Sequence, residues 1–533
     1  MKRFIVCLLF LGLVNESAAQ LSRYIIKLRD KQSTPYSLNT PSAYLSPAAI
    51  DRRTRYNILI DSTDLPVDPA YIDSLKNAGA VTILNASKWL NSVTIQTTDQ
   101  AALNKINSFP FVITATPIAP RLMNRKPKSV QRSGHQSIKQ NGRNLVAYRV
   151  LIDSFNYGLS ATQVKLHKGD FLHNIGLRGQ GMHIGVLDAG FLNFLTVPAL
   201  DSIRTNGQIR DTWDFVSRHA SVNEDNSHGM QVLSVMAANL PGQFVGTAPK
   251  ALYYLYRSED AASEYPIEEH NWVCAAERVD SIGGDIINSS LGYNLFDDPS
   301  FNYSFADMDG NTTIAARGAD LAAKKGILVV NSAGNEGSNG WGRIITPADG
   351  DSVLAVGAVN ANGAPASFTS RGPSADGRIK PDVASLGVGT IVQFPGGTIG
   401  PNNGTSFAAP NMTGLAACLW QGFREFNNMK IIDALRRAGS RFNNPNDTIG
   451  YGIPDVKKAL IALTKEYSTA SVNLSNCRTT ITWNSKDMGA MKYEIERSTG
   501  SPAGFIKIGE KASSGSVFNN KTHQFSDTLI NVP

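Results

Sequence analysis

Cysteine is scarce in this chain of 533 residues, which contains four of them. Cys7 lies in an apolar stretch near the amino terminus that we expect to be removed, so that Cys274, Cys418 and Cys477 would remain. An odd number excludes a fully paired disulfide framework, and the apolar surroundings of Cys418 favour a buried thiol. Stability must therefore come from a large hydrophobic core.

Long hydrophobic runs are also missing. Residues 4–14 are apolar but too few to cross a bilayer. They follow Lys2 and Arg3 and precede small residues, a pattern that predicts a secretory signal peptide over residues 1–19. A lipoprotein would need a cysteine at the cleavage point, whereas Cys7 lies inside the apolar stretch. We expect a protein without a transmembrane anchor, secreted and extracellular or associated with the cell surface.

Acidic residues are absent from residues 121–149, which hold eight lysines and arginines. Without these eight charges the formal net charge of +7 becomes −1, so the basic character comes from one polar segment. Such a segment is typical of a solvated linker, and Tyr148 is its single aromatic residue, which argues against a nucleic-acid partner. We predict a basic linker and processing region over residues 119–150, with cleavage between Pro120 and Phe155.

One serine stands at the start of an apolar stretch. Ser406 follows Gly404 and Thr405 and precedes a helix predicted over residues 407–419. A hydroxyl there lies at the positive end of a helix beside free backbone N–H groups, which suits a nucleophile that must form an oxyanion. Serine is equally favoured as a helix cap, so this segment alone leaves both interpretations open.

Two other segments supply partners for that serine. Asp188 ends a short apolar run and would emerge at the carboxyl edge of a parallel sheet, where catalytic groups collect. His228 precedes apolar residues spaced for a packed helix. Imidazole can take the serine proton, and a carboxylate fixes the imidazole tautomer. The chain order Asp188, His228, Ser406 is that of the subtilisin scaffold.

With these residues the chain resembles the subtilisin-like serine peptidases (subtilases), in particular secreted bacterial multi-domain forms. Residues 287–292 resemble the family's substrate-binding strand, and residues 330–337 resemble its oxyanion-hole segment. Residues 368–383 resemble a further family signature before the serine. Two positions depart from the family pattern. Ala189 and Met230 stand where the family usually has hydroxyl residues, which bears on the rate rather than on the identity.

The resemblance implies a role for each matched residue. Ser406 would attack the scissile carbonyl. His228 would act as general base and then as general acid, and Asp188 would orient it.

Further residues would bind the substrate and its oxyanion. Asn335 would donate its side-chain amide to the oxyanion, alongside the backbone N–H of Ser406. A turn residue is the alternative for Asn335, but its place after an apolar strand suits an active-site loop. Ser290, Leu291 and Gly292 would form the edge along which an extended substrate lies.

The remaining pattern divides the chain into units. Residues 20–118 predict a small α+β domain, which in a secreted subtilase implies an inhibitory pro-domain; an unrelated module is the alternative. Residues 151–464 alternate strands and helices and predict an α/β catalytic domain, a subtilisin-like parallel sheet with helices on both faces. Residues 465–533 predict half-buried antiparallel strands and resemble a partial β-sandwich of the fibronectin type III-like kind. This module is abbreviated, or the chain stops early.

Together these features predict a secreted serine endopeptidase, made as a zymogen, that hydrolyses peptide bonds in protein or peptide substrates through an acyl-enzyme. Its own pro-domain would be an intramolecular inhibitor. The chemistry requires no cofactor and no metal; structural calcium is frequent in the family, but no compact ligand motif can be assigned. A catalytically dead scaffold would be expected to have lost one of the four site residues, and an adhesion protein would not need them. A sedolisin-type acid peptidase would have a glutamate in place of His228.

Overall fold

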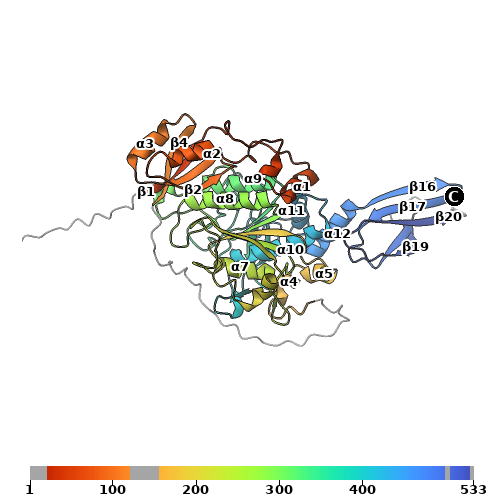
Figure 1. Ribbon diagram of the computed structural model, residues 1–533. Helices are drawn as coiled ribbons and strands as arrows, with labels where there is room; N and C mark the ends of the chain where they lie inside the picture. Colours follow the sequence, from red (N-terminus) through yellow and green to blue (C-terminus); the bar gives the residue numbers. More distant parts are fainter. Residues whose placement is uncertain (1–20, 121–154, 499–503, 529–533) are drawn as a thin grey trace, which may run out of the picture.

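The computed structural model describes residues 21–120, 155–498 and 504–528. They form an N-terminal domain, a central domain and a C-terminal β region that projects from the other two (Figure 1). The signal peptide predicted over residues 1–19 and nearly all of the linker predicted over residues 119–150 lie outside the described residues.

Seven parallel strands form the sheet of the central domain, in the order β13-β12-β11-β10-β5-β9-β6. Their bounds are β5 (His183–Asp188), β6 (Ile209–Asp214), β9 (Leu252–Arg257), β10 (Ile286–Ser289), β11 (Leu328–Ser332), β12 (Val353–Val359) and β13 (Val383–Leu386). Every residue of β10 to β13 is buried. A sheet covered on both faces needs apolar side chains on both, which explains why these strands are rich in consecutive apolar residues.

Helices cover both faces of this sheet, so the predicted α/β fold is confirmed. On one face lie α7 (His228–Ala237), α10 (Thr405–Gly422), α11 (Asn428–Arg437) and α12 (Val456–Tyr467), and on the other α8 (Ile267–Ile282) and α9 (Ile314–Lys324). Successive side chains of a strand enter different cores: Val186 packs with the first group of helices and Leu187 with the second. All of α10 is buried, and the short helices α4 (Ala161–Lys165), α5 (Gly169–Asn174) and α6 (Asp201–Thr205) complete the domain.

The N-terminal domain is a four-stranded antiparallel sheet in the order β2-β3-β1-β4, with its own hydrophobic core. Its elements are β1 (Leu21–Leu28), α1 (Pro47–Arg55), α2 (Pro69–Lys76), β2 (Thr82–Ser87), β3 (Ser92–Gln96), α3 (Gln100–Ser108) and β4 (Val112–Pro120). The sequence pattern predicts an α+β unit here, and the structure confirms it. Helix α1 gave no apolar periodicity because two of its three buried residues are Arg52 and Arg53.

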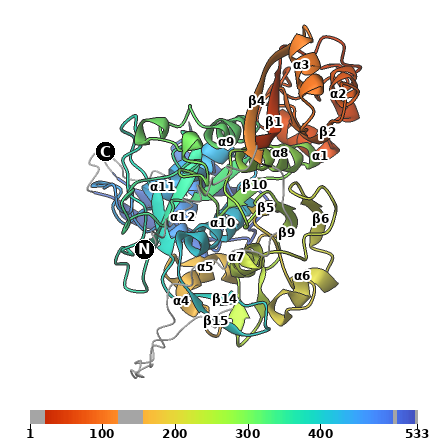
Figure 2. The same ribbon diagram turned by 90° about the vertical axis from the view of Figure 1, so that its left-hand side faces the viewer.

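This domain rests on α8, as both views show (Figures 1 and 2). Asp280 of α8 accepts hydrogen bonds from Arg52, Arg53 (2.9 Å) and Lys88 (3.2 Å) of the N-terminal domain. A second pair has the charges reversed: Lys325 of the central domain donates to Asp64 of the N-terminal domain at 2.8 Å. The interface is therefore held by buried charges that cross it in both directions.

The C-terminal region forms two small antiparallel sheets, β16-β17-β20 and β18-β19. Their strands are β16 (Thr469–Ser475), β17 (Arg478–Ser485), β18 (Lys492–Arg497), β19 (Ile506–Ala512) and β20 (Lys521–Thr528). The prediction of half-buried strands is wrong for β16, whose residues are all exposed, with Val472 at 67% and Leu474 at 64%. Alternation marks a strand, but burial of its apolar face needs a second layer to cover it.

Within the described ranges, no helix has the length and apolarity needed to cross a bilayer. Cys274 and Cys418 are buried and Cys477 is exposed, and none of them is in a disulfide. The buried thiol predicted for Cys418 is therefore confirmed.

Candidate active site

Asp188 is the last residue of β5 and is fully buried. Its Oδ1 accepts hydrogen bonds from Nδ1 of His228 (2.7 Å) and from the backbone N–H of Ala189 (2.8 Å). Its Oδ2 is buried and has no hydrogen-bond partner among the described residues. A hydroxyl side chain at position 189 could approach this oxygen, whereas the side chain of alanine has no donor.

His228 begins α7, and its backbone N–H donates to Oδ1 of Asn226 at 2.7 Å. Its ring lies 5.9 Å from the ring of Phe407, centroid to centroid, which sets the imidazole beside the start of α10. Burial would lower the pKa of His228, but the carboxylate of Asp188 outweighs burial and raises it. Since the Nδ1–H of His228 donates to the carboxylate of Asp188, Nε2 is left as the basic nitrogen.

Ser406 is the second residue of α10, and the cap position belongs to Gly404. The alternative that Ser406 is a helix cap is therefore wrong. Its hydroxyl donates a long hydrogen bond, 3.4 Å, to the carbonyl oxygen of Ser290, and no hydrogen bond within the described part of the chain joins it to His228. Contacts of this kind are often loose before substrate binds.

Ser290 also supports the helix that carries Ser406. Pro410 follows Ser406 by one turn and has no N–H, so the Ser406 carbonyl lacks its usual helical donor. The hydroxyl of Ser290 donates to that carbonyl at 2.8 Å. The start of α10 is thereby fixed to the segment that follows β10.

Asn335 lies in the loop after β11 with an exposed side chain. Its Oδ1 accepts hydrogen bonds from the backbone N–H and the side-chain hydroxyl of Thr405, both at 2.9 Å. Because the oxygen end of the amide is held, the NH₂ end is the one left to meet a ligand. Thr405 was not assigned a role from the sequence, although it stands directly before Ser406.

Leu291 and Gly292 continue the chain from Ser290 and are half-buried. The carbonyl of Leu291 accepts a hydrogen bond from the side chain of Asn331 at 3.0 Å. A Cβ atom on Gly292 would come within 2.5 Å of Cδ1 of Ile345, so this position needs glycine for the two segments to approach. The structure thus brings Ser290, Asn335, His228 and Asp188 together around the start of α10.

Two groups of side chains in the described ranges are close enough to hold a metal ion: Asp214/His219/Glu224 and Glu259/Glu264/Glu268. In the first group Asp214 already pairs with Arg257 at 2.8 Å and caps a turn through its Oδ1. The absence of a cofactor requirement stays a prediction.

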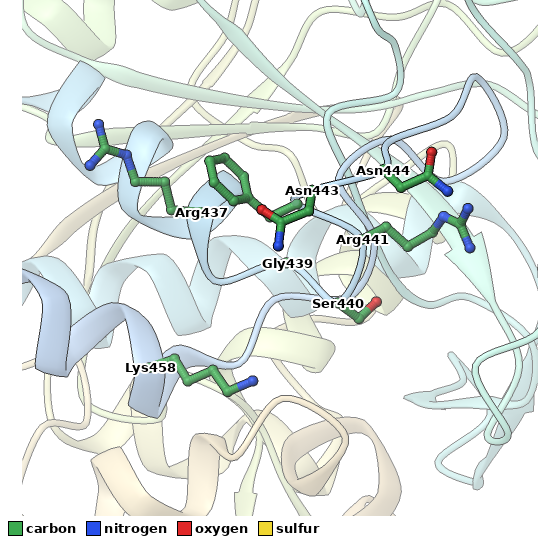
Figure 3. Close-up of a pocket in the computed structure, with 8 residues that line it drawn as sticks. Arg437, Gly439, Ser440, Arg441, Asn443, Asn444 and Lys458 are labelled. Atoms are coloured by element: carbon green, nitrogen blue, oxygen red, sulfur yellow. The ribbon is translucent and has the colours of Figure 1, made fainter.

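A surface pocket of about 430 Å³ lies elsewhere, around the loop after α11. Its lining residues are Arg437, Gly439, Ser440, Arg441, Phe442, Asn443, Asn444 and Lys458. Figure 3 shows Arg437 and Arg441 extending away from each other. Because these basic groups do not converge, we assign no ligand to this pocket.

A seven-stranded parallel sheet with an aspartate–histidine pair beside a helix-borne serine defines an α/β serine hydrolase. The model of the subtilase family, Peptidase S8, matches residues 179–452. The chain belongs to this family and is a subtilisin-like serine peptidase, as its sequence motifs predicted. The Peptidase S8 propeptide domain of Bacteroidota matches residues 23–136, so the N-terminal domain is a pro-domain and the alternative of an unrelated module is wrong.

Individual relatives agree with this assignment. The chain is 31% identical to subtilisin E of Bacillus subtilis (strain 168) over 310 residues, which cover 57% of this chain and 71% of that protein. It is also 31% identical to subtilisin of Bacillus pumilus over 286 residues, 53% of this chain and 90% of the other. Among solved structures, the crystal structure of MycP1 from Mycobacterium smegmatis aligns with a TM-score of 0.45 and 20% identity, over 58% of this chain and 86% of that one.

Proposed function

We propose that this subtilase is a secreted endopeptidase that uses Asp188, His228 and Ser406 as its catalytic triad. The observation that carries the proposal is the 2.7 Å hydrogen bond between His228 and the buried carboxylate of Asp188, next to the helix start that bears Ser406. His228 takes the hydroxyl proton through Nε2 while Ser406 attacks the scissile carbonyl. The protonated imidazole then donates to the leaving amine, and water hydrolyses the acyl-enzyme.

The oxyanion formed in this step needs donors already in place. Asn335 supplies its side-chain NH₂ group, and its orientation is supported by the two hydrogen bonds from Thr405 to Oδ1. The backbone N–H of Ser406 lies in the first turn of α10, where no intrahelical acceptor exists. The segment Ser290 to Gly292 provides the edge along which the substrate extends, held through its backbone and with little demand on its sequence.

The pro-domain acts as an intramolecular inhibitor until the linker is cut between Pro120 and Phe155. The signal-like residues 1–19 direct export, and the buried charge pairs on α8 keep the pro-domain in place meanwhile. The substrates are proteins or peptides outside the cytoplasm, and the chemistry uses no cofactor.

A fluorophosphonate that labels active-site serines tests this function. Processed wild-type protein should be labelled and should hydrolyse peptide amides, whereas Ser406→Ala should do neither. Absence of labelling in correctly processed wild-type protein would overturn the proposal. Amino-terminal sequencing of secreted active protein checks activation, because an active enzyme that begins at Gln20 would contradict the zymogen mechanism.

A further inference from the structure

Three glutamates gather just beyond the carboxyl end of β9, close to the proposed triad. Carboxylate oxygens of Glu259, Glu264 and Glu268 lie within 4.8 Å of one another. The side chains of Glu259 and Glu268 are buried, 8% and 1% exposed, and Glu264 is half-buried. None of the three forms an ion pair with a lysine, arginine or histidine of the described residues. Carboxylates so close together and so deep are neutralised by a positive partner or by taking up protons.

The hydrogen bonds of this group show where a ligand would be received. Both oxygens of Glu268 accept backbone N–H groups, from Asp260 (2.8 Å) and Tyr265 (3.0 Å), which favours its charged form. Oε2 of Glu259 accepts the hydroxyl of Tyr293 at 3.1 Å. Oε1 of Glu259 is buried and has no partner among the described residues. A side chain more than nine-tenths buried thus keeps one carboxylate oxygen unused.

The electrostatics agree with the geometry. Burial, and then the charges of Asp188 and Asp260, raise the pKa of Glu259 to about 7, against the side-chain interactions with Tyr293 and Glu268, which lower it. Burial and the neighbouring carboxylates also raise the pKa of Glu268. A cation would reverse these shifts, because it stabilises the charged form of each carboxylate.

The glutamate group lies next to the proposed triad. The backbone N–H of Ser258, the residue before Glu259, donates to the carbonyl oxygen of Asp188 at 3.1 Å. The charge of Glu259 is one of those that raise the pKa of His228, after the larger effects of burial and Asp188. Tyr293, which holds Glu259, directly follows Gly292 of the proposed substrate edge.

The pro-domain approaches this group with a positive charge and with its carboxyl end. Strands β1 and β4 run down to α8 (Figure 2), where Ile118 and Ala119 pack with Ile267. Arg23 of β1 donates to the carbonyl oxygen of Pro120, the last residue of β4. Burial lowers the pKa of Arg23, and Asp260 and Glu268 act against that effect, so its guanidinium lies within their field.

We propose that Glu259, Glu264 and Glu268 form a subsite of the substrate cleft that binds a lysine or arginine side chain N-terminal to the scissile bond. This inference rests on the proposed peptidase activity of Ser406. The carboxyl end of the pro-domain lies beside the group, and the predicted cleavage between Pro120 and Phe155 follows it, so residues of this end precede the bond that is cut. A basic side chain suits the group better than calcium, which takes about six to eight oxygen ligands, because both oxygens of Glu268 already accept backbone N–H groups.

A matched peptide series tests the subsite with enzyme processed from the full chain. Fluorogenic peptides carry lysine, arginine, glutamine or leucine in turn at each of the four positions before the scissile bond. At one of these positions we expect kcat/KM for the basic residues to exceed that for glutamine by about tenfold or more. Glu259→Gln and Glu268→Gln should each reduce this ratio. The control Glu269→Gln, also buried on α8 but bonded to Tyr303 instead, should keep it.

The outcomes separate the two proposals. Wild-type enzyme that is labelled by the phosphonate and cleaves glutamine peptides, yet shows no preference for basic residues, would overturn the subsite alone. The subsite is also overturned if Glu259→Gln and Glu268→Gln both retain the full ratio of kcat/KM between basic and glutamine peptides. If calcium raises the Tm of the wild type and not of the Glu259→Gln and Glu268→Gln variants, while the ratio is unchanged, the group is a metal site and the subsite is refuted. Failure of phosphonate labelling would overturn both proposals.

Discussion

Replacing Asp280 by asparagine should loosen the pro-domain from the catalytic domain. Asp280 is fully buried, and Arg52, Arg53 and Lys88, all from the pro-domain, donate to its carboxylate. Burial alone would raise the pKa of Asp280, but these three cations hold it well below its usual range. Asparagine keeps the shape and removes the charge, which leaves the buried Arg52 without a carboxylate and Arg53 with Asp64 alone. Breaking a buried pair in this way costs about 3–5 kcal/mol, or at least about 100-fold in the equilibrium between docked and undocked pro-domain.

Hydrogen–deuterium exchange on the uncut chain, made with Ser406→Ala, measures this equilibrium directly. Amides of α8 and β2, which meet at the interface, should exchange about 100-fold faster or more in Asp280→Asn. The matched control is Asp211→Asn, which breaks a half-exposed pair with Arg278 on the same helix. That pair is worth about 1 kcal/mol or less, so exchange at the interface should change little. Equal exchange in the two variants would refute the idea that the buried charges hold the pro-domain.

Three further predictions concern the active site and its control. Asn335→Ala should lower kcat by about 10²–10³-fold, and Thr405→Val, which removes one of the two bonds to Oδ1, by about tenfold, with KM little changed in both. Ala189→Ser should raise the stability by about 1 kcal/mol in thermal unfolding by giving Oδ2 of Asp188 a donor, whereas Ala189→Val should give no gain. Burial lowers the pKa of His270, which bonds to the pro-domain, to about 3. Because undocked His270 binds a proton below about pH 6.5, the free energy of docking should weaken by about 1.4 kcal/mol for each pH unit below that value. Hydrogen–deuterium exchange at the interface of His270→Gln should lose this part of the pH dependence.

Most of the central domain could be predicted because its strands are short apolar runs and its helices have regular spacing. The N-terminal domain was recognised as α+β, but α1 was not, since Arg52 and Arg53 are buried and pair with Asp280, more than 200 positions away. The C-terminal strands were recognised by alternation, while Val472 is exposed because nothing in the described part of the chain covers its side chain. Local periodicity predicts elements; burial depends on what packs against them.

The three glutamates also show the difference between what a local pattern predicts and what packing decides. Glu259, Glu264 and Glu268 appear in the sequence as ordinary charges beside a helix, with no spacing typical of a ligand site. They become unusual because the loop after β9 brings Glu259 and Glu264 close to Glu268 of α8, where Tyr293 bonds to Glu259. Thr405 was likewise visible as a residue, yet its two bonds to Asn335 join segments 70 positions apart.

The sequence by itself determined the class of chemistry, because Asp188, His228 and Ser406 stand in a characteristic order, each in a local pattern that predicts a strand end or a helix start. It also determined the α/β alternation of the catalytic domain, since hydrophobic periodicity is a local property. Only the tertiary structure decided that Ser406 is not a helix cap, that Oδ2 of Asp188 has no partner among the described residues, and that buried charges hold the pro-domain on α8. These features depend on distances between segments far apart in the chain, which packing sets and no local pattern records.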